Sequence, residues 1–117
     1  MTETEINIEW KKLTIKLQES FQKEPDLKTV LFLIGVQELG KGAQHFSKEE
    51  KQDLMHIAIC KILSYSGYYE LEGVDKEGWP IWKSTKKLPF LNILNQESLL
   101  KMHVLEYFEK EVFGTEQ

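Results

Sequence analysis

Three side chains that could do chemistry together fall on consecutive turns of one predicted helix. Asp53 precedes His56 by three residues and Cys60 follows it by four, so all three lie on one side of that helix. A carboxylate and an imidazole beside a thiol are the parts of an activated cysteine nucleophile, and the same ligand types bind zinc. A nucleophilic thiol favours a helix N-terminus, whereas Cys60 would lie mid-helix. We therefore favour a polar helix flank with one partly buried cysteine over a metal site or a nucleophile.

A second group of polar side chains comes earlier in the chain. Glu38 lies near the end of an otherwise apolar segment, where the helix dipole disfavours a negative charge, and His45 follows in a glycine-containing loop. If that loop folds back toward the next helix, these side chains could line one metal or small-ligand pocket formed by Glu38, His45, Asp53 and His56. A di-metal site in a helical bundle needs two Glu-x-x-His pairs. This chain has only Asp53-x-x-His56, so we disfavour a di-metal centre.

A hairpin is the third feature with functional potential. Aromatic and β-branched residues between 68 and 85 flank Asp75-Lys76-Glu77-Gly78, a pattern typical of a type I turn closed by a left-handed glycine. Pro80 cannot donate a ladder hydrogen bond, so its strand should be an edge. A regular register directs one set of side chains toward the helices, namely Tyr69, Leu71, Trp79 and Ile81.

The opposite face of that hairpin would then point to solvent. It carries Glu70, Glu72, Trp82 and Ser84. An exposed tryptophan between charged neighbours is a typical anchor for a partner protein, and an edge strand can accept a further strand. We therefore predict a partner-binding surface at Trp82, Glu70 and Glu72, with coverage of Trp82 by another segment as the alternative.

Two helices are predicted before residue 40. Over residues 8–23, apolar side chains recur at spacings of three and four, at Trp10, Leu13, Leu17 and Phe21. The second helix, over residues 27–39, is apolar nearly all round, with Asp26 as its N-cap and Gly40 as its C-cap. A buried strand over Val30–Val36 is the alternative for that run.

Two further helices are predicted around the hairpin. Ser47 and Glu50 form a capping-box pattern that starts a helix over residues 48–66, ended by Gly67. Asn95 would cap a last helix from residue 96 to about 113. His103 falls on the polar side of that helix, so we predict that it is exposed.

These elements predict a single α+β domain over residues 1–117 that is mostly α, with frayed ends at 1–7 and 114–117. Of about four helices, three would pack around the apolar second helix, and one hairpin, between the third and fourth helices, would close a side. This order resembles a winged helix, in which residues 48–66 would read DNA and the hairpin would be the wing. Glu49 and Asp53 would then face DNA and repel its phosphates.

Composition limits the function further. The 117 residues are 41% hydrophobic and 29% charged, with a net charge of −4, which is ordinary for a soluble globular protein. All fifteen basic residues are lysines, which lowers the expectation of specific DNA reading. The chain has neither a phosphate loop nor a nucleophile elbow nor a dinucleotide fingerprint. We therefore lean against an enzyme and expect no cofactor.

Other sequence features bear on the compartment. One cysteine forbids an internal disulfide framework and favours a reducing cytoplasm. The acidic N-terminus lacks a signal-peptide pattern. The longest apolar run, Val30–Val36, is too short to span a bilayer. We expect a cytoplasmic protein with no membrane association.

Several segments resemble a group of small uncharacterised bacterial proteins, mostly from Bacteroidetes. They are FLIGVQELG at 32–40, KQDLMHIA at 51–58, and GYYELEG with EGWPIW at 67–73 and 77–82. The resemblance covers about residues 28–110. It implies a cytosolic bacterial protein and transfers no catalytic residue.

Taken together, the residues favour a small cytosolic interaction or regulatory module that uses the hairpin surface and binds another protein. A homodimer through the N-terminal helix is an alternative to packing of that helix within the chain. The other two interpretations are a winged-helix-like nucleic-acid binder and a metal- or small-ligand-binding protein or enzyme that uses Glu38, Asp53 and His56.

Overall fold

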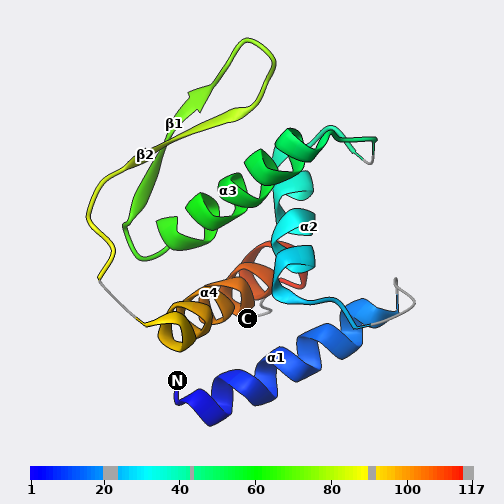
Figure 1. Cartoon of the computed structure of the whole chain (residues 1–117), viewed down its shortest axis with the longest axis vertical. Coiled ribbons are helices and arrows are strands. Elements are labelled where there is room, and N and C mark those ends of the chain that lie inside the picture. The colour runs from blue at the N-terminus through cyan, green and yellow to red at the C-terminus, as the bar shows by residue number, and fades with distance from the viewer. Residues whose placement is uncertain (20–23, 43, 90–91, 115–117) are drawn as a thin grey trace. The chain divides into compact units, whose positions relative to one another are not determined.

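The chain forms helices and one hairpin in the predicted order (Figure 1). The computed structural model describes residues 1–19, 24–42, 44–89 and 92–114. Its elements are α1 (Glu3–Gln18), α2 (Leu27–Leu39), α3 (Lys48–Ser64), β1 (Tyr69–Val74), β2 (Pro80–Ser84) and α4 (Ile93–Tyr107), which a short π-helical segment, η1 (Phe108–Val112), continues. The predicted fold class, α+β and mostly α with a hairpin between the third and fourth helices, is therefore confirmed.

The described residues divide into two compact units. The terminal unit comprises Met1–Leu27 with Phe90–Gln117, and the central unit comprises Lys28–Pro89. The terminal unit contains α1, α4 and η1. The central unit contains α2, α3 and the hairpin, and it carries all the side chains that the sequence singled out as candidate sites. The extent of a single domain stays a prediction.

In the terminal unit, α1 and α4 lie side by side and run in the same direction. At their starts the Ser98 hydroxyl donates to the Glu3 carboxylate, and at their ends the Lys16 ammonium lies 4.2 Å from the centre of the Phe113 ring. Their buried side chains are Ile6, Leu13, Thr14, His103, Val104, Tyr107 and Phe108. Apolar burial of this kind is the main term that holds two amphipathic helices together.

Helix α1 begins earlier than predicted. Its first residue is Glu3 and its N-cap is Thr2, whose hydroxyl accepts from the Glu5 N–H while the Glu5 carboxylate accepts from the Thr2 N–H. The predicted helix start at residue 8 was therefore wrong, because this capping box starts the helix earlier. Fraying of residues 1–7 stays a prediction. Leu13 is buried and Trp10 and Leu17 are half-buried, as their spacing predicts. Phe21 lies outside the described residues.

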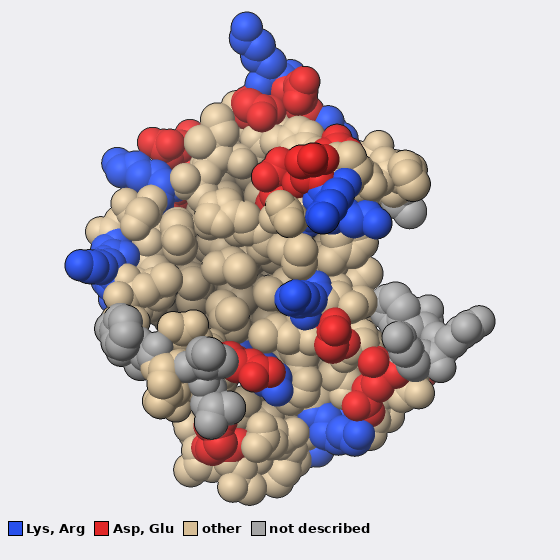
Figure 2. All heavy atoms as spheres, in the orientation of Figure 1, with Lys and Arg blue, Asp and Glu red and all other residues tan. Residues whose placement is uncertain are grey.

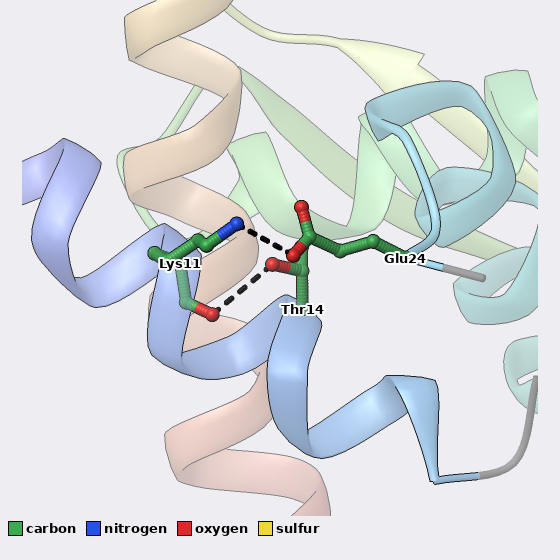
Figure 3. A network of polar contacts seen from close by, with 3 residues as sticks. All are labelled: Lys11, Thr14 and Glu24. Carbon is green, nitrogen blue, oxygen red and sulfur yellow. Dashed lines mark hydrogen bonds and ion pairs between the residues drawn. The ribbon is translucent and has the colours of Figure 1, made fainter.

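One polar side chain of α1 is buried with its hydrogen bond made. The Thr14 hydroxyl donates to the Lys11 carbonyl at 3.1 Å, and the Lys11 ammonium pairs with the Glu24 carboxylate at 2.7 Å (Figure 3). Because a buried hydroxyl with a partner costs little, Thr14 fits the helix interface. The exposed Lys11–Glu24 pair contributes little stability.

Helix α4 also begins before its predicted start. Asn92, not Asn95, is the N-cap, and its side chain accepts from the Asn95 N–H at 2.8 Å. The prediction that His103 is exposed was wrong, since only 4% of its surface is accessible. Its Nδ1 lies 2.8 Å from the Leu99 carbonyl oxygen. That hydrogen bond satisfies the ring nitrogen and lets the imidazole be buried.

In the central unit, α2 has the bounds that the sequence predicted, and the strand alternative for Val30–Val36 was wrong. Gly40 ends the helix with a positive φ of 73° and an N–H bonded to the Val36 carbonyl. Helix α3 crosses α2 closely at Gly35, where an added Cβ would lie 2.2 Å from the Leu54 carbonyl oxygen. Glycine therefore lets the two backbones meet.

Helix α3 has the predicted start and a slightly earlier end than expected. The Ser47–Glu50 capping box is formed in both directions. The helix ends at Ser64 rather than Ser66, and Gly67 follows with a φ of 81°. Left-handed glycine is the usual residue at that point.

The hairpin turn forms as the sequence indicates. The Gly78 N–H donates to the Asp75 carbonyl at 3.0 Å and the Asp75 N–H donates to the Trp79 carbonyl at 2.9 Å. The Asp75 carboxylate accepts from the backbone N–H groups of Glu77 and Trp79, each at 2.9 Å. The Lys41 ammonium reaches over from the α2–α3 loop and donates to the Glu77 carbonyl, which joins that loop to the turn.

The predicted register of the hairpin was wrong for the part of the ladder beyond Glu72, away from the turn. Gly73 pairs with Ile81, but Leu71 pairs with Trp82, so the ladder shifts by one residue at Glu72. Such a bulge moves the following side chains to the opposite face. Tyr69 and Trp82 therefore share a face, and Ile81 lies on the other. Gly73, with a φ of 144°, supplies the backbone conformation that the bulge uses.

Candidate functional site

The residues expected to form a site are all in the central unit, but they do not gather at one point. In the described part of the chain, no three His, Cys, Asp or Glu side chains are placed to hold one metal ion. The expected grouping of Glu38, His45, Asp53 and His56 around one metal ion is therefore not formed among the described residues. Two smaller arrangements exist instead, one around Cys60 and one between α3 and the hairpin turn.

Cys60 and His56 are in contact, as their spacing predicts. The Cys60 Sγ lies 3.5 Å from the His56 Nε2, so the thiol can donate to a neutral imidazole. The His56 ring is exposed and also meets the Tyr69 ring edge to face, with 6.5 Å between their centres. Cys60 itself is fully buried, and this burial raises the pKa of the thiol to about 11. At neutral pH the sulfur is a thiol, which argues against a nucleophile.

We predict that Cys60 reacts slowly in the folded protein. At pH 8 a pKa of about 11 leaves roughly 0.1% of Cys60 as thiolate, against about 9% at its usual pKa of 9.0. The rate of modification by a disulfide reagent should therefore be at least about a hundred times lower than in urea. Equal rates in buffer and in urea would contradict the burial of this thiol.

The same raised pKa makes folding stability depend on alkaline pH. The usual pKa of the Cys60 thiol is 9.0, and burial raises it in the folded state. Between pH 9 and about 11 the unfolded chain releases this proton while the folded chain keeps it. The unfolding free energy should therefore fall as pH rises through that window, and Cys60→Ala should remove this part of the fall.

Glu38 has a structural role at the end of α2. Its carboxylate lies 4.0 Å from the Lys61 ammonium of α3, and both side chains are mostly buried. Lys61 also lies over the Tyr65 ring at 5.6 Å. The lysine offsets the unfavourable dipole at the helix end, so the position of Glu38 does not require an acid or base role. His45 is exposed in the α2–α3 loop.

A shallow pocket of about 280 Å³ lies between α3 and the hairpin turn. Its lining residues are Glu50, Asp53, His56, Ile57, Asp75, Trp79 and Pro80. Glu50 and Asp75 already accept backbone hydrogen bonds. Asp53 and His56 are exposed there and remain accessible to a ligand. Acidic side chains, with lysines beside them, gather near the hairpin turn and the start of α3 (Figure 2).

Sequence reasoning missed the hairpin side of this pocket. Asp75, Trp79 and Pro80 reach Asp53 and His56 only because the hairpin folds over α3 (Figure 1). Trp79 packs against a buried cluster formed by Leu39, Phe46 and Leu54. The expected inward packing of Trp79 is therefore confirmed, and this tryptophan anchors the hairpin.

The remaining side chains of the hairpin reverse part of the prediction. Trp82 was expected to be exposed, but it is half-buried and its indole Nε1 is buried, with no hydrogen-bond partner among the described residues. Leu71 and Ile81 were expected to pack inward, yet they are 52% and 41% exposed. The bulge at Glu72 accounts for Trp82 and Ile81, because it moves Trp82 to the face of Tyr69 and Ile81 to the other face. Leu71 pairs with Trp82 and is exposed although it lies on the same face as Tyr69. Glu70 and Glu72 are exposed, as predicted.

Comparisons of the chain with protein-family models, with curated proteins and with solved structures find no match. Among the helices of the described ranges, none is both long enough and apolar enough to cross a membrane.

Proposed function

We propose that this protein is a small interaction module that binds an extended, basic segment of a partner protein along β1. The observation that carries the proposal is the exposure of two apolar side chains on this strand. Leu71 is 52% exposed and Val74 is 63% exposed. Exposed apolar side chains on a strand are a common mark of a binding surface. A reducing bacterial cytoplasm, favoured by the lone Cys60, is the proposed setting.

The backbone of β1 supports binding of a strand. Within the described residues the sheet contains β1 and β2 alone, so β1 has one edge without a neighbouring strand. Such an edge offers N–H and carbonyl groups to an extended peptide. Strand β2 begins with Pro80, which has no N–H, whereas β1 contains no proline. We therefore assign the partner strand to β1.

The charges of β1 specify what the partner carries. Glu70 and Glu72 are both exposed on this strand, and lysine or arginine side chains on the bound segment would complement them. The exposed Asp53 carboxylate, which lines the shallow pocket beside the turn, adds a further negative charge to the central unit. The anchor is thus Leu71 with Val74 rather than the half-buried Trp82.

A pair of defined peptides tests this proposal. One peptide alternates lysine with valine, and the other alternates glutamate with valine. We expect the lysine peptide alone to shift the backbone amide signals of residues 69–74 in nitrogen-15 NMR spectra. Glu70→Gln with Glu72→Gln should weaken its binding several-fold, while Glu49→Gln, an exposed change on α3, should not. Equal binding of both peptides, or shifts confined to other residues, would overturn the proposal.

The other interpretations have less support. A nucleic-acid interface on α3 would place the exposed Glu49 and Asp53 against phosphates, which like-charge repulsion disfavours. A small-ligand site would have to use Asp53 and His56 in the shallow pocket, and Glu38 is paired with Lys61 instead. Neither arrangement supplies the apolar surface that β1 does.

A further inference from the structure

Helix α1 and the residue before its N-cap carry exposed apolar side chains, of which Met1 and Ile8 line the groove beside α4. Ile8 and Ile15 are 51% and 52% exposed, and Met1, just before the helix, is 62% exposed. These three residues are here called the α1 stripe, and each is seven positions from the next in the sequence. Seven residues are close to two helical turns, so Ile8 and Ile15 lie along one line of the helix, and Met1 precedes the N-cap Thr2. The spacing of the stripe is that of a helix-pairing seam, although α1 already buries Leu13 on its opposite side.

The charges of α1 are divided between its two halves. Glu3, Glu5 and Glu9 lie in the first half, and Lys11, Lys12 and Lys16 lie in the second. A parallel pairing of two such helices would place like charges together. An antiparallel pairing would place the acidic half of each helix on the basic half of the other.

From this pattern we propose that α1 pairs antiparallel with α1 of a second copy of the chain, about a two-fold axis beside Ile8. Ile8 then meets Ile8 of the second copy, and Ile15 meets Met1. On one flank of the stripe, Glu5 meets Lys12 of the second copy, and the two-fold axis repeats that pair. The sequence is thus self-complementary in both its apolar and its charged positions.

The surface beside the stripe extends the apolar area. A groove of about 860 Å³ runs between α1 and the C-terminal helix of the same unit. Its apolar lining includes Met1, Ile8, Leu13, Met102, Phe108 and Phe113. The side chains of the second copy can cover this groove, so the interface is wider than three residues. The hairpin proposal involves the other unit and is independent of this one.

Sedimentation velocity over a concentration series tests the pairing. We expect a reversible dimer, and we expect Ile8→Glu to weaken it on the order of a hundred-fold, because two carboxylates would meet at the axis. Ile81→Glu makes the same change at an exposed hairpin position and should leave the dimer intact. A monomer at every concentration, or equal loss with Ile81→Glu, would overturn the proposal.

A charge exchange keeps the test decisive if Ile8→Glu disturbs folding. Glu5→Lys and Lys12→Glu should each weaken self-association on the order of ten-fold. Mixing the two variants should produce a heterodimer, because the lysine introduced by Glu5→Lys then meets the glutamate introduced by Lys12→Glu, and the native Glu5–Lys12 pair remains at the other end. A folding defect in either variant would persist in the mixture, so recovery of association on mixing can come only from the restored charge pairs. If the two folded variants fail to associate when they are mixed, the antiparallel register is refuted.

Discussion

Gly35→Ala is expected to lower the free energy of unfolding by about 2–4 kcal/mol. A Cβ at position 35 would lie 2.2 Å from the Leu54 carbonyl oxygen and 2.7 Å from its carbonyl carbon. These are backbone atoms of α3, so no rotamer change can relieve the contact, and the two helices would have to separate. Urea unfolding followed by circular dichroism measures the change.

Whether Gly35→Ala lowers or raises the free energy of unfolding distinguishes the effect of tertiary packing from that of helix propensity. In the interior of an exposed helix, alanine in place of glycine stabilises by about 1 kcal/mol. At Gly35 the contact with Leu54 opposes that gain and exceeds it. Gln37→Ala, at an exposed position of the same helix, serves as the control and should change stability by less than about 0.5 kcal/mol. A stabilised Gly35→Ala variant would show that α2 and α3 do not cross at this point.

Trp79→Ala is expected to have the second largest effect, about 2–4 kcal/mol. The indole packs against the cluster of Leu39, Phe46 and Leu54, so its removal opens the joint between the hairpin and the two helices. We also expect faster amide hydrogen exchange throughout β1 and β2, because the strands lose their anchor. Binding of the lysine–valine peptide should weaken with it.

Trp82→Phe is the matched comparison on the same strand. The Trp82 Nε1 is buried and makes no hydrogen bond within the described part of the chain. Phenylalanine keeps most of the apolar surface and removes a donor whose desolvation is costly. We expect a change of no more than about 1 kcal/mol. If Trp82→Phe costs more than Trp79→Ala, then Trp82 and not Trp79 holds the hairpin in place.

Local signals in the sequence predicted several elements correctly. The Ser47–Glu50 capping box and the left-handed Gly40 set the start of α3 and the end of α2. The turn from Asp75 to Gly78 and the contact of Cys60 with His56 follow from spacings of three and four residues. Each of these interactions joins residues no more than four positions apart in the sequence, so the residue types alone determine it.

Two missed features had local signals as well. The Thr2–Glu5 capping box starts α1, and the same pattern was recognised at α3. A glycine inside a strand, here Gly73, often marks a bulge. The predicted register instead assumed a regular ladder without a bulge. With the bulge included, Trp82 shares a face with Tyr69, and Ile81 points away from it.

Other features depend on contacts between distant segments, and the tertiary structure alone decided them. Glu38 pairs with Lys61 across two helices, and Trp79 joins Asp53 and His56 in one pocket because the hairpin covers α3. His103 is buried even though its helix position is polar in sequence. Periodicity identifies which residues share a face, but which face is buried depends on the packed neighbour, and a shift of one residue exchanges the two faces of a strand.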